Sequence, residues 1–450
     1  MTDQEFTQWF DAHEDAEYIS VFVCDLNGVF RGKRILRKQA GKIPQGGVKL
    51  PLSTMGLDIW GDDAIASGQV FETGDTDGIC LPTGRGPYEV SWTGKPSALV
   101  PMWMFTENNV AHGADPRHAL SAILDKYIKL GLTPVCATEL EFYLYDPKCQ
   151  KNGAPISPLN GKRVTDSATY SLAGLTDFEA FLNDVYDACE QMDIPADAAI
   201  SENGCGQFEI NMYHVDNALK AADDAILFKQ IVKGVAQQHG FGATFMAKPH
   251  SDMPGSGLHI HFSILDSSGT NIFDNDTPEG SDKLQHAVGG LIETMAEFAL
   301  FSAPHYNSYQ RLRPHAHAPT KVAWGYENRT TAIRIPNGPN IARRVEYRVA
   351  GADANPYLVL AAVLGAALYG LENKIKAPDP ITGNAYELTS VATIPESWNE
   401  AIQAFEEGKI GKILFDDLLR QMFLAGKKQE YAYFASRVEQ SVRDIYLDVV

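Results

Sequence analysis

The 450-residue chain contains only six cysteines, and no two of them form a Cys-x-x-Cys pair. Scattered cysteines of this kind are typical of reduced thiols in a reducing compartment rather than of a disulfide framework. The first residues include Asp3 and Glu5 and lack the basic, apolar character of a secretory signal. The sequence therefore predicts a cytoplasmic protein.

Long hydrophobic runs and an excess of basic residues are also absent. The longest apolar run, residues 356–371, is too short for a typical membrane span, so we expect a buried helix there. Lys and Arg number 38 against 57 Asp and Glu, and the net charge of -19 argues against nucleic acid as the main partner. With 44% hydrophobic and 21% charged residues, the composition is that of a soluble globular protein, and the length indicates two or more domains.

The common phosphate-binding loops are missing as well. The sequence has no GxxxxGKS/T loop, no GxGxxG after a predicted strand and no kinase HRD or DFG motif. These absences argue against the usual nucleotide-binding folds. If the protein binds phosphate groups, side chains on a β-sheet must then bind them.

Polar side chains two residues apart are the main positive signal. They are Glu139/Glu141, Gln207/Glu209, His259/His261 and Arg344/Glu346/Arg348. Successive side chains of a strand alternate between faces, so the members of each group point the same way. Apolar neighbours indicate that the opposite face of these strands is covered. Charged groups in such surroundings need a partner to offset desolvation, and the simplest common partner is a metal ion.

The candidate metal ligands comprise five carboxylates and one imidazole, with no thiolate: Glu139, Glu141, Glu202, Glu209, Glu346 and His259. Such oxygen-rich sets suit Mg²⁺ or Mn²⁺ and disfavour zinc. A carboxylate site for two or three divalent ions is the usual way to hold a nucleoside triphosphate. Positive side chains are needed beside it, and the segments 328–336 and 342–348 supply arginines whose forked guanidinium groups match phosphate and carboxylate oxygens.

A division of the chain is predicted near residue 113. Short strands are expected over residues 19–24 and 29–36, because the Asn-Gly of the intervening turn is a strong hairpin signal. A helix is predicted to begin at Pro116, with further helices over residues 177–191 and 216–239 and through most of the carboxy-terminal part. We therefore expect a small β-rich domain over residues 1–113 and a larger domain over residues 114–450.

Six spaced segments resemble the motifs of the glutamine synthetase superfamily, in family order and over nearly the whole chain. They are residues 139–142, 202–209, 255–263, 307–309, 328–336 and 342–348, followed by Asn355-Pro356-Tyr357. The resemblance implies an α+β fold with an amino-terminal β-grasp domain and a catalytic domain whose curved antiparallel sheet forms a funnel flanked by helices. It also implies active sites between subunits and self-association into rings, commonly dodecamers.

The reaction implied by the resemblance has two steps: ATP phosphorylates the γ-carboxylate of glutamate, and a nitrogen nucleophile then displaces phosphate. One metal ion would be held by Glu141, Glu202 and Glu209, and a second by Glu139, His259 and Glu346. The nucleotide would be touched by His261, Ser263, Arg334 and Arg344. Glutamate would be bound by Arg311, Arg348 and the backbone near Gly255, and Arg329 would stabilise the phosphoryl group in transfer.

Departures from the family pattern indicate which amine reacts. Where ammonia-using members carry a glutamate before Ala-Pro, this chain has His317, and Pro51 stands where a neighbouring subunit would supply an aspartate. Without these two anions a small cation such as ammonium is held poorly, and the lost side chain leaves room for a substituent. Similar changes occur in γ-glutamylpolyamine and other γ-glutamylamide synthetases. The sequence therefore predicts an ATP-dependent ligase that joins glutamate to putrescine or spermidine.

Several alternatives stay open. His317 either takes a proton from the attacking amine or merely replaces the lost acid, and His315 shares this ambiguity. The run of residues 57–63 offers acidic and aromatic groups for a distal ammonium, or is simply an exposed turn. The rival functions are an ammonia-dependent glutamine synthetase, a ligase for ethanolamine or a short alkylamine, and a non-catalytic synthetase-like sensor. The complete ligand set argues against the sensor, because buried carboxylates without metal are costly.

Overall fold

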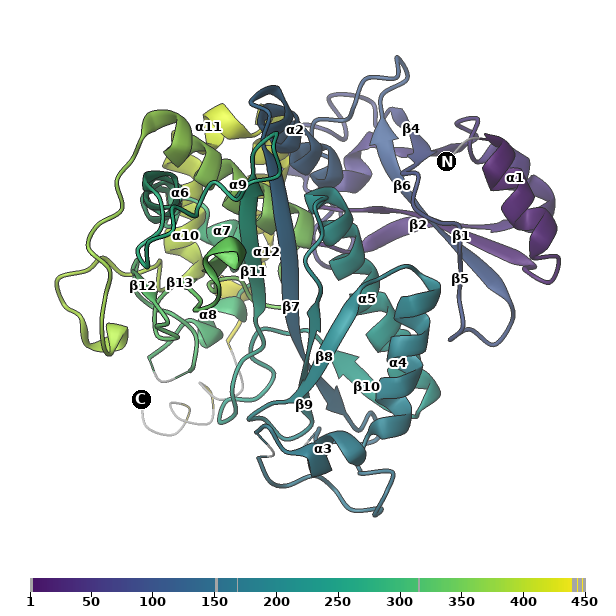
Figure 1. Ribbon diagram of the computed structural model, residues 1–450. Helices are drawn as coiled ribbons and strands as arrows, with labels where there is room; N and C mark the ends of the chain where they lie inside the picture. Colours follow the sequence, from purple (N-terminus) through teal and green to yellow (C-terminus); the bar gives the residue numbers. More distant parts are fainter. Residues whose placement is uncertain are drawn as a thin grey trace.

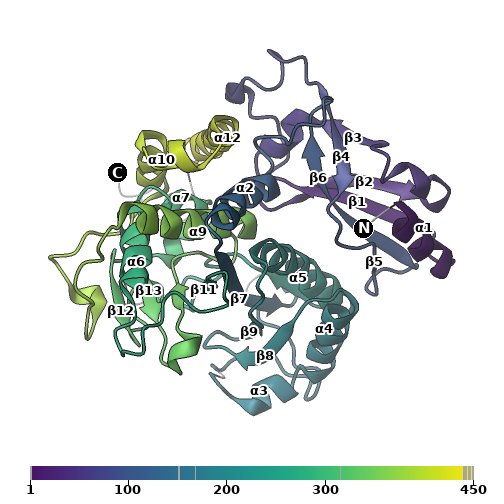
Figure 2. The same cartoon turned by 45° about the horizontal axis from the view of Figure 1, so that its top comes forward.

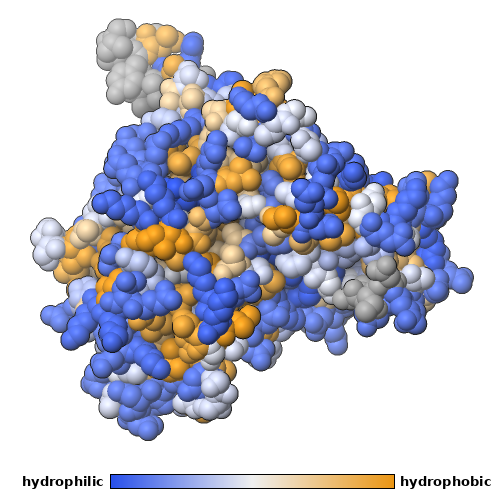
Figure 3. Space-filling view, turned by 90° about the horizontal axis from the view of Figure 1, so that it is seen from above, coloured by the Kyte–Doolittle hydropathy of each residue, from blue (hydrophilic) through white to orange (hydrophobic). Residues whose placement is uncertain are grey.

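Two mixed β-sheets, each flanked by helices, make up the protein (Figure 1). The computed structural model describes residues 3–149, 153–167, 169–314, 316–438, 443 and 447. Hydrophilic residues dominate the face in Figure 3, where apolar residues gather in separate patches. This surface agrees with a composition in which 21% of the residues are charged.

The first sheet has the strand order β2-β1-β6-β4-β3, with β5 paired to β6. Its strands are β1 (Tyr18–Cys24), β2 (Phe30–Leu36), β3 (Val48–Pro51), β4 (Asp77–Pro82), β5 (Tyr88–Glu89) and β6 (Ser97–Phe105). The predicted hairpin is confirmed, because β1 and β2 pair antiparallel from Cys24 opposite Phe30 onward. One carboxylate oxygen of Asp25 shapes the turn by accepting the backbone N–H groups of Asn27 and Val29, each at 2.9 Å. The sheet is mixed because β1 and β6 run parallel.

The second sheet has the strand order β12-β13-β14-β11-β7-β9-β8, with β10 paired to β7. Its strands are β7 (Thr133–Tyr145), β8 (Ala196–Ser201), β9 (Gln207–Met212), β10 (Gly242–Thr244), β11 (Leu258–Leu265), β12 (Trp324–Tyr326), β13 (Ile333–Ile335) and β14 (Val345–Tyr347). Neighbouring strands are antiparallel except for the parallel pair β12 and β13. The predicted strands around the acidic and histidine pairs are thus confirmed. The Arg344-to-Arg348 segment forms a strand only over its central part.

The α-helices are α1 (Asp3–Ala12), α2 (Pro116–Lys129), α3 (Leu172–Thr176), α4 (Glu179–Gln191), α5 (Ala218–Gln238), α6 (Asp282–Thr294), α7 (Ala299–Ser302), α8 (Ser308–Arg311), α9 (Pro356–Asn373), α10 (Trp398–Glu407), α11 (Gly411–Leu414) and α12 (Asp417–Ala435). Short 3₁₀ helices cover Arg37–Lys42, Leu52–Gly56, Ile65–Ser67, Asn340–Ala342 and Ala385–Glu387. The predicted helix at Pro116 is confirmed, with the Asp115 carboxylate capping it by accepting the Arg117 N–H at 2.8 Å. Helices α4 and α5 fall within the two further predicted ranges.

Helix α9 is the predicted apolar helix and lies in the core. Its length and composition would allow it to cross a membrane, but 78% of it is buried inside the molecule. It packs against α2, α5 and α6, as Figure 2 shows. The apolar run therefore serves packing within the fold.

Strand β7 shows how the sheet separates core from site. Leu140, Phe142 and Leu144 are fully buried on one face, where the Phe142 ring lies 6.2 Å from the Phe228 ring of α5. Residues at alternate positions point to the other face, which leaves Glu139 and Glu141 on the side away from α5. The helices thus cover one face, and the charged residues share the other.

Candidate active site

Five adjacent strands, β9, β7, β11, β14 and β13, bring the predicted ligands to one face of the second sheet. The residues directly opposite each other are Glu141/Glu209, Glu139/His259, His261/Glu346 and Arg334/Glu346. Side chains opposite each other on neighbouring strands lie within contact distance. The two-residue spacing in the sequence therefore reports a real convergence of charge.

A cavity of about 480 Å³ covers part of this face. The predicted site residues that line it are Glu139, Glu141, Glu202, Glu209, Gly255, His259, Arg311, His317, Arg329, Arg334 and Arg348. Four other predicted residues, His261, Ser263, Arg344 and Glu346, belong to the same part of the sheet but do not line this cavity. Most of the predicted site is thus assembled in one place.

Glu139 lies between the two histidines of β11. Its Oε2 is 3.1 Å from His259 Nδ1, and its Oε1 is 2.9 Å from His261 Nε2. Burial by itself raises the pKa of Glu139, but the two imidazoles hold that pKa well below its ordinary value. Glu139 is therefore a carboxylate at any physiological pH.

Glu346 is a buried carboxylate clamped by arginines. Arg334 Nη1 donates to its Oε2 at 2.8 Å, and Arg348 Nη1 donates to its Oε1. Burial raises the pKa of Glu346, yet the positive charge of Arg348 more than offsets this, and the pKa falls to about 2. Both guanidinium groups, predicted to meet nucleotide and glutamate, thus contact a predicted metal ligand in this structure.

Glu141, Glu202 and Glu209 form a cluster of like charges. Burial and then the charge of Glu141 raise the pKa of Glu202 to about 7. Burial also raises the pKa of Glu209 well above its ordinary value, and Glu139 and Glu141 raise it further. Glu141 is anchored by the N–H of Gly257, which donates to its Oε2 at 2.8 Å. A cation among these carboxylates would remove the repulsion that raises their pKa values.

Two groups of side chains in the described part of the chain are close enough to share a metal ion. They are Glu139, Glu209 and His259, and Glu139, His261 and Glu346, with ligand atoms within 4.8 Å of one another in each group. The grouping differs from the predicted division of ligands, because Glu139 belongs to both groups and His261 joins one. The donors are mainly carboxylate oxygens, with one imidazole in each group, and this set fits Mg²⁺ or Mn²⁺.

Arg311 and Gly255 lie together in the cavity wall. The Arg311 side chain is buried, and its Nη1 donates to the carbonyl of Val349 at 2.8 Å. A Cβ atom at position 255 would lie 2.5 Å from the Ala247 carbonyl oxygen and 2.7 Å from Arg311 Cγ, so only glycine fits. The Gly255 carbonyl accepts a hydrogen bond from Gln207 Nε2 at 3.0 Å. Arg329, by contrast, is exposed at the cavity rim.

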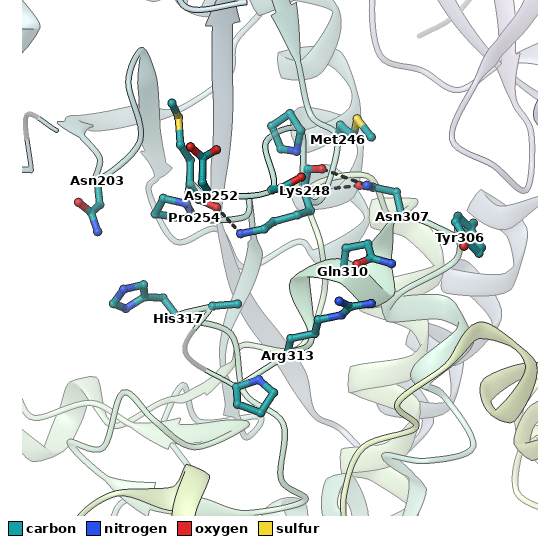
Figure 4. Close-up of a pocket in the computed structure, with 15 residues that line it drawn as sticks. Asn203, Met246, Lys248, Asp252, Pro254, Tyr306, Asn307, Gln310, Arg313 and His317 are labelled. Atoms are coloured by element: carbon teal, nitrogen blue, oxygen red, sulfur yellow. Dashed lines mark hydrogen bonds between the residues drawn. The ribbon is translucent and has the colours of Figure 1, made fainter. Parts of the chain in front are cut away.

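His317 lines both the cavity of about 480 Å³ and a second, larger cavity. It is exposed and adopts a left-handed backbone conformation with φ 59. The second cavity has a volume of about 780 Å³ and shares Asn203, Pro254, Ala316 and His317 with the first. Figure 4 shows Asn203 and His317 on one side of this space and Asn307, Gln310 and Arg313 on the other. His315 lies outside the described residues.

Two aromatic residues in the cavity wall were not predicted. Tyr170 and Tyr386 come from loops far apart in the sequence, and both line the cavity of the predicted ligands. Tyr170 has a positive φ of 57, and Tyr386 lies in the 3₁₀ helix Ala385–Glu387. Neither residue belongs to a strand with polar side chains two residues apart, so no sequence pattern indicates that they line the cavity.

The run of residues 57–63 forms a turn against helix α12. The Asp58 carboxylate is buried and accepts the N–H groups of Trp60 at 3.0 Å and Asp62 at 2.9 Å. The Trp60 ring lies 4.3 Å from the ring of Tyr433. These groups are engaged within the chain, which favours the turn over the predicted alternative of an ammonium site.

Comparison with known proteins establishes the family. Residues 113–446 match the family model for the catalytic domain of glutamine synthetase. The chain belongs to the glutamine synthetase family. It is 36% identical to gamma-glutamylputrescine synthetase PuuA of Escherichia coli (strain K12), over 97% of this chain and 93% of that protein. It is also 32% identical to glutamate–isopropylamine ligase of Pseudomonas sp, over 98% and 97%.

The fold agrees with this assignment. A solved structure of a GmaS/ADP complex superposes with a TM-score of 0.85 at 25% identity, covering 98% of this chain and 99% of that chain. The predicted family and the flanking helices are thus confirmed. The catalytic sheet, predicted to be antiparallel, is mixed, because β12 and β13 run parallel. The protein is an ATP-dependent glutamate–amine ligase of a family that uses ATP and divalent metal ions.

Proposed function

We propose that the amine substrate is a polyamine, putrescine or spermidine. The observation that supports this most strongly is the cavity of about 780 Å³ that adjoins the predicted reaction site at His317. Ammonium needs no such space, and the position expected to hold its acidic contact is occupied by a histidine. An extended amine can place one nitrogen beside His317 and the rest of its chain in the second cavity.

The relatives support an amine larger than ammonium, since one is named for putrescine and another for isopropylamine. The second of these names favours a rival candidate, a ligase for a small monoamine such as isopropylamine or ethanolamine. Ammonia is the remaining candidate. The replacement of both expected acidic contacts, by Pro51 and His317, argues against it.

The residues have the following proposed roles in catalysis. An oxygen of the glutamate γ-carboxylate attacks the γ-phosphorus of ATP, ADP leaves, and an acyl phosphate forms. The amine nitrogen then attacks the acyl carbon, and phosphate departs with the former carboxylate oxygen. Arg329 stabilises the charge of the phosphoryl group in transfer, and His317 accepts the proton that the amine loses. Holding the amine close to the acyl carbon favours this second step.

The substrates and metal ions have proposed sites around this centre. Divalent ions bound by Glu139, Glu141, Glu202, Glu209, His259 and Glu346 would neutralise charge on the phosphate oxygens. Arg311, Arg348 and Gly255 hold glutamate. The nucleotide contacts His261, Ser263, Arg334 and Arg344. A geometric link within this last set supports it, because Arg344 Nε donates to His261 Nδ1 at 3.2 Å.

We also propose a β-grasp domain over residues 1–113, a catalytic domain with a funnel-shaped sheet over residues 114–450, and rings that form a dodecamer in the cytoplasm. The strands of the first sheet end at Phe105, and those of the second begin at Thr133. Among the described residues, those lining the two cavities begin at Glu139. The described amino-terminal part of the chain therefore contributes no residue to these cavities. The amino-terminal part of a neighbouring subunit could line the site instead.

An amine panel tests the proposal. Phosphate release is measured with ATP, Mg²⁺ and glutamate in the presence of putrescine, spermidine, isopropylamine, ethanolamine, methylamine or ammonium. We expect the highest kcat/KM with putrescine or spermidine. A higher value with a monoamine selects the rival ligase, and saturation by ammonium at low concentration rejects the polyamine proposal.

A further inference from the structure

A third cavity, of about 510 Å³, lies where the turn between β1 and β2 meets helix α5 and the segment around β10. Its walls include Asn27–Val29 of the amino-terminal part and residues 243–246 and Asp353 of the catalytic part. Figure 2 shows α5 between the two sheets. The cavity shares Met246 and Pro249 with the large cavity beside His317 but contains none of the predicted site residues.

Two lysines one helical turn apart on α5 point into this cavity. Lys229 is 7% exposed, and its Nζ donates to the carbonyl of Ala354 at 2.7 Å. Lys233 is exposed at the cavity mouth. Their ammonium groups lie 5.8 and 5.9 Å from the centre of the Phe245 ring. Within the described residues, neither lysine forms an ion pair.

The electrostatics of this pair are unfavourable without a bound anion. Burial, and after it the charge of Lys233, lowers the pKa of Lys229 to about 7. Asp353 is the acidic residue that lines the cavity. Its Oδ2 accepts the Ser308 hydroxyl at 2.6 Å, and its Oδ1 is buried with no hydrogen-bond partner among the described residues. Two lysine amino groups thus share one carboxylate. Burying an ammonium group without a full counter-charge is costly, and an anion between the lysines would offset that cost.

Four aromatic side chains in the wall carry polar atoms, and two of them interact with groups outside the cavity lining. Tyr143, Tyr145, His250 and His305 line the cavity with the two lysines. The Tyr143 hydroxyl donates to the Pro254 carbonyl at 2.8 Å, and His305 Nδ1 lies 3.9 Å from Glu430 Oε2. The amino groups of the two lysines, with Tyr145 and His250 beside them, suit the oxygens of a carboxylate or phosphate.

We propose that this cavity is a regulatory site for a small oxyanion, a carboxylate or a phosphate, held between Lys229 and Lys233. The inference goes beyond the proposed amine ligation, because it concerns a cavity separate from the predicted reaction site.

A short path of contacts connects the cavity to the glutamate-binding side. Asp353 faces the lysines and accepts a hydrogen bond from Ser308, the first residue of α8. The last residue of α8 is Arg311, which lines the predicted reaction site. A bound anion repels the Asp353 carboxylate and weakens its hold on Ser308. The anion therefore raises the KM for glutamate through the position of Arg311.

The test compares the wild-type protein with Lys233→Gln and with Lys412→Gln. The second variant removes a positive charge from an exposed lysine of α11, away from the cavity, and is the matched control. Inorganic phosphate and succinate are the two probes, since one is a phosphate and the other a dicarboxylate. Tm and the KM for glutamate are measured for each protein with and without each probe.

We expect at least one probe to raise the Tm of wild type and Lys412→Gln by about 2 °C more than that of Lys233→Gln. The same probe should raise the KM for glutamate about fivefold in the first two proteins and much less in Lys233→Gln. The probe that acts identifies the anion class. Because anions also bind at arginines of the reaction site, only the difference between proteins supports the proposal.

The proposal would be overturned if the probes changed the Tm, or the KM for glutamate, equally in all three proteins. A change in oligomeric mass of Lys233→Gln, with no anion dependence, would also overturn it and would assign Lys233 to a contact between subunits. The Tm readout needs no turnover. Failure of the regulatory site is therefore distinguishable from failure of the amine assignment.

Discussion

The glutamates of the site lie in opposite electrostatic environments, and their pKa values are shifted in opposite directions. Glu139 and Glu346 are held ionised by imidazole and guanidinium partners, whereas Glu202 and Glu209 lie among like charges that favour their protonated forms. This division fits a site that awaits cations, because a bound divalent ion stabilises the ionised form of every ligand. Neutralising one of the repelled carboxylates should therefore stabilise the metal-free protein.

Glu202→Gln is predicted to raise the Tm of the protein in EDTA by about 2 °C at pH 8, and by much less at pH 5. Folding raises the pKa of Glu202 from 4.5 to about 7, so its unfavourable ionisation in the folded state grows as the pH rises through this window. The glutamine variant lacks this cost. Thermal unfolding at both pH values checks the result, with Glu107→Gln, at an exposed turn, as the control.

With Mg²⁺ added in place of EDTA, the same variant should gain less Tm than the wild type, since one ligand is lost. An unchanged difference between variant and wild type from pH 5 to pH 8 would contradict the like-charge account. An equal response to Mg²⁺ would contradict the proposed role of Glu202 as a ligand.

His317 is tested best by asparagine, because its φ of 59 is a conformation that asparagine tolerates and alanine does not. We predict that His317→Asn lowers kcat with the preferred amine about 100-fold if the imidazole accepts the amine proton. The KM for glutamate should stay unchanged, because Arg311 and Arg348 are untouched. Steady-state kinetics measures both, and a kcat within about twofold of wild type would show that His317 merely fills a position.

At the scale of elements, one strong connection between the two parts of the chain runs through the start of helix α9. Asn355 Oδ1 caps the helix by accepting the Tyr357 N–H at 3.0 Å, and its Nδ2 donates to the Asp25 carbonyl at 2.9 Å. Asp25 lies in the turn between β1 and β2, so a single buried side chain serves both a helix cap and a contact with the first sheet.

Asn355→Ala is predicted to lower the free energy of unfolding by about 2 kcal/mol, because the helix cap and the buried hydrogen bond to the Asp25 carbonyl are both lost. The control is Ser397→Ala, which removes a cap of α10 that makes a single bond of 3.3 Å to the Glu400 N–H. That change should cost about 0.5–1 kcal/mol. Urea unfolding measures both, and equal losses would show that the contact with Asp25 contributes nothing.

The elements also show how far the sequence predicts the site. Alternation along β7 and β11 places Glu139 with Glu141 and His259 with His261, because the period of a strand is independent of tertiary context. The order of strands is not readable from this pattern. The strand order places Glu346 beside His261, and Arg334 and Arg348 both form ion pairs with the Glu346 carboxylate. The contacts of Glu139 with both histidines depend on this order, and the division of the ligands between two metal ions stays a prediction.

Loops are the other part of the site that the sequence does not predict. Tyr170 and Tyr386 enter the cavity from irregular segments, where no periodicity indicates which way a side chain points. The cavity beside His317 likewise depends on the packing of segments near residues 203, 246–254 and 306–317. Its existence could not be predicted from the replacement of an acid by histidine alone.

At the scale of the whole molecule, an acyl phosphate must be protected from water until the amine attacks. The described lining residues of the two cavities come from Glu139 onward, and the part of the chain that carries Pro51 belongs to the other sheet. We therefore predict that the active form is an assembly of 49.3 kDa chains, with neighbouring subunits closing the site. Light scattering on the eluting protein gives the mass, and a fully active monomer would contradict the prediction.

The central claim is that ATP activates the γ-carboxylate of glutamate before an amine larger than ammonium attacks it. Glutamate labelled with ¹⁸O in the γ-carboxylate tests this directly when it is incubated with ATP, Mg²⁺ and putrescine. The account predicts γ-glutamylputrescine as product and one ¹⁸O atom in each phosphate released, both detected by mass spectrometry. Unlabelled phosphate, or labelled phosphate formed only with ammonium, would contradict it.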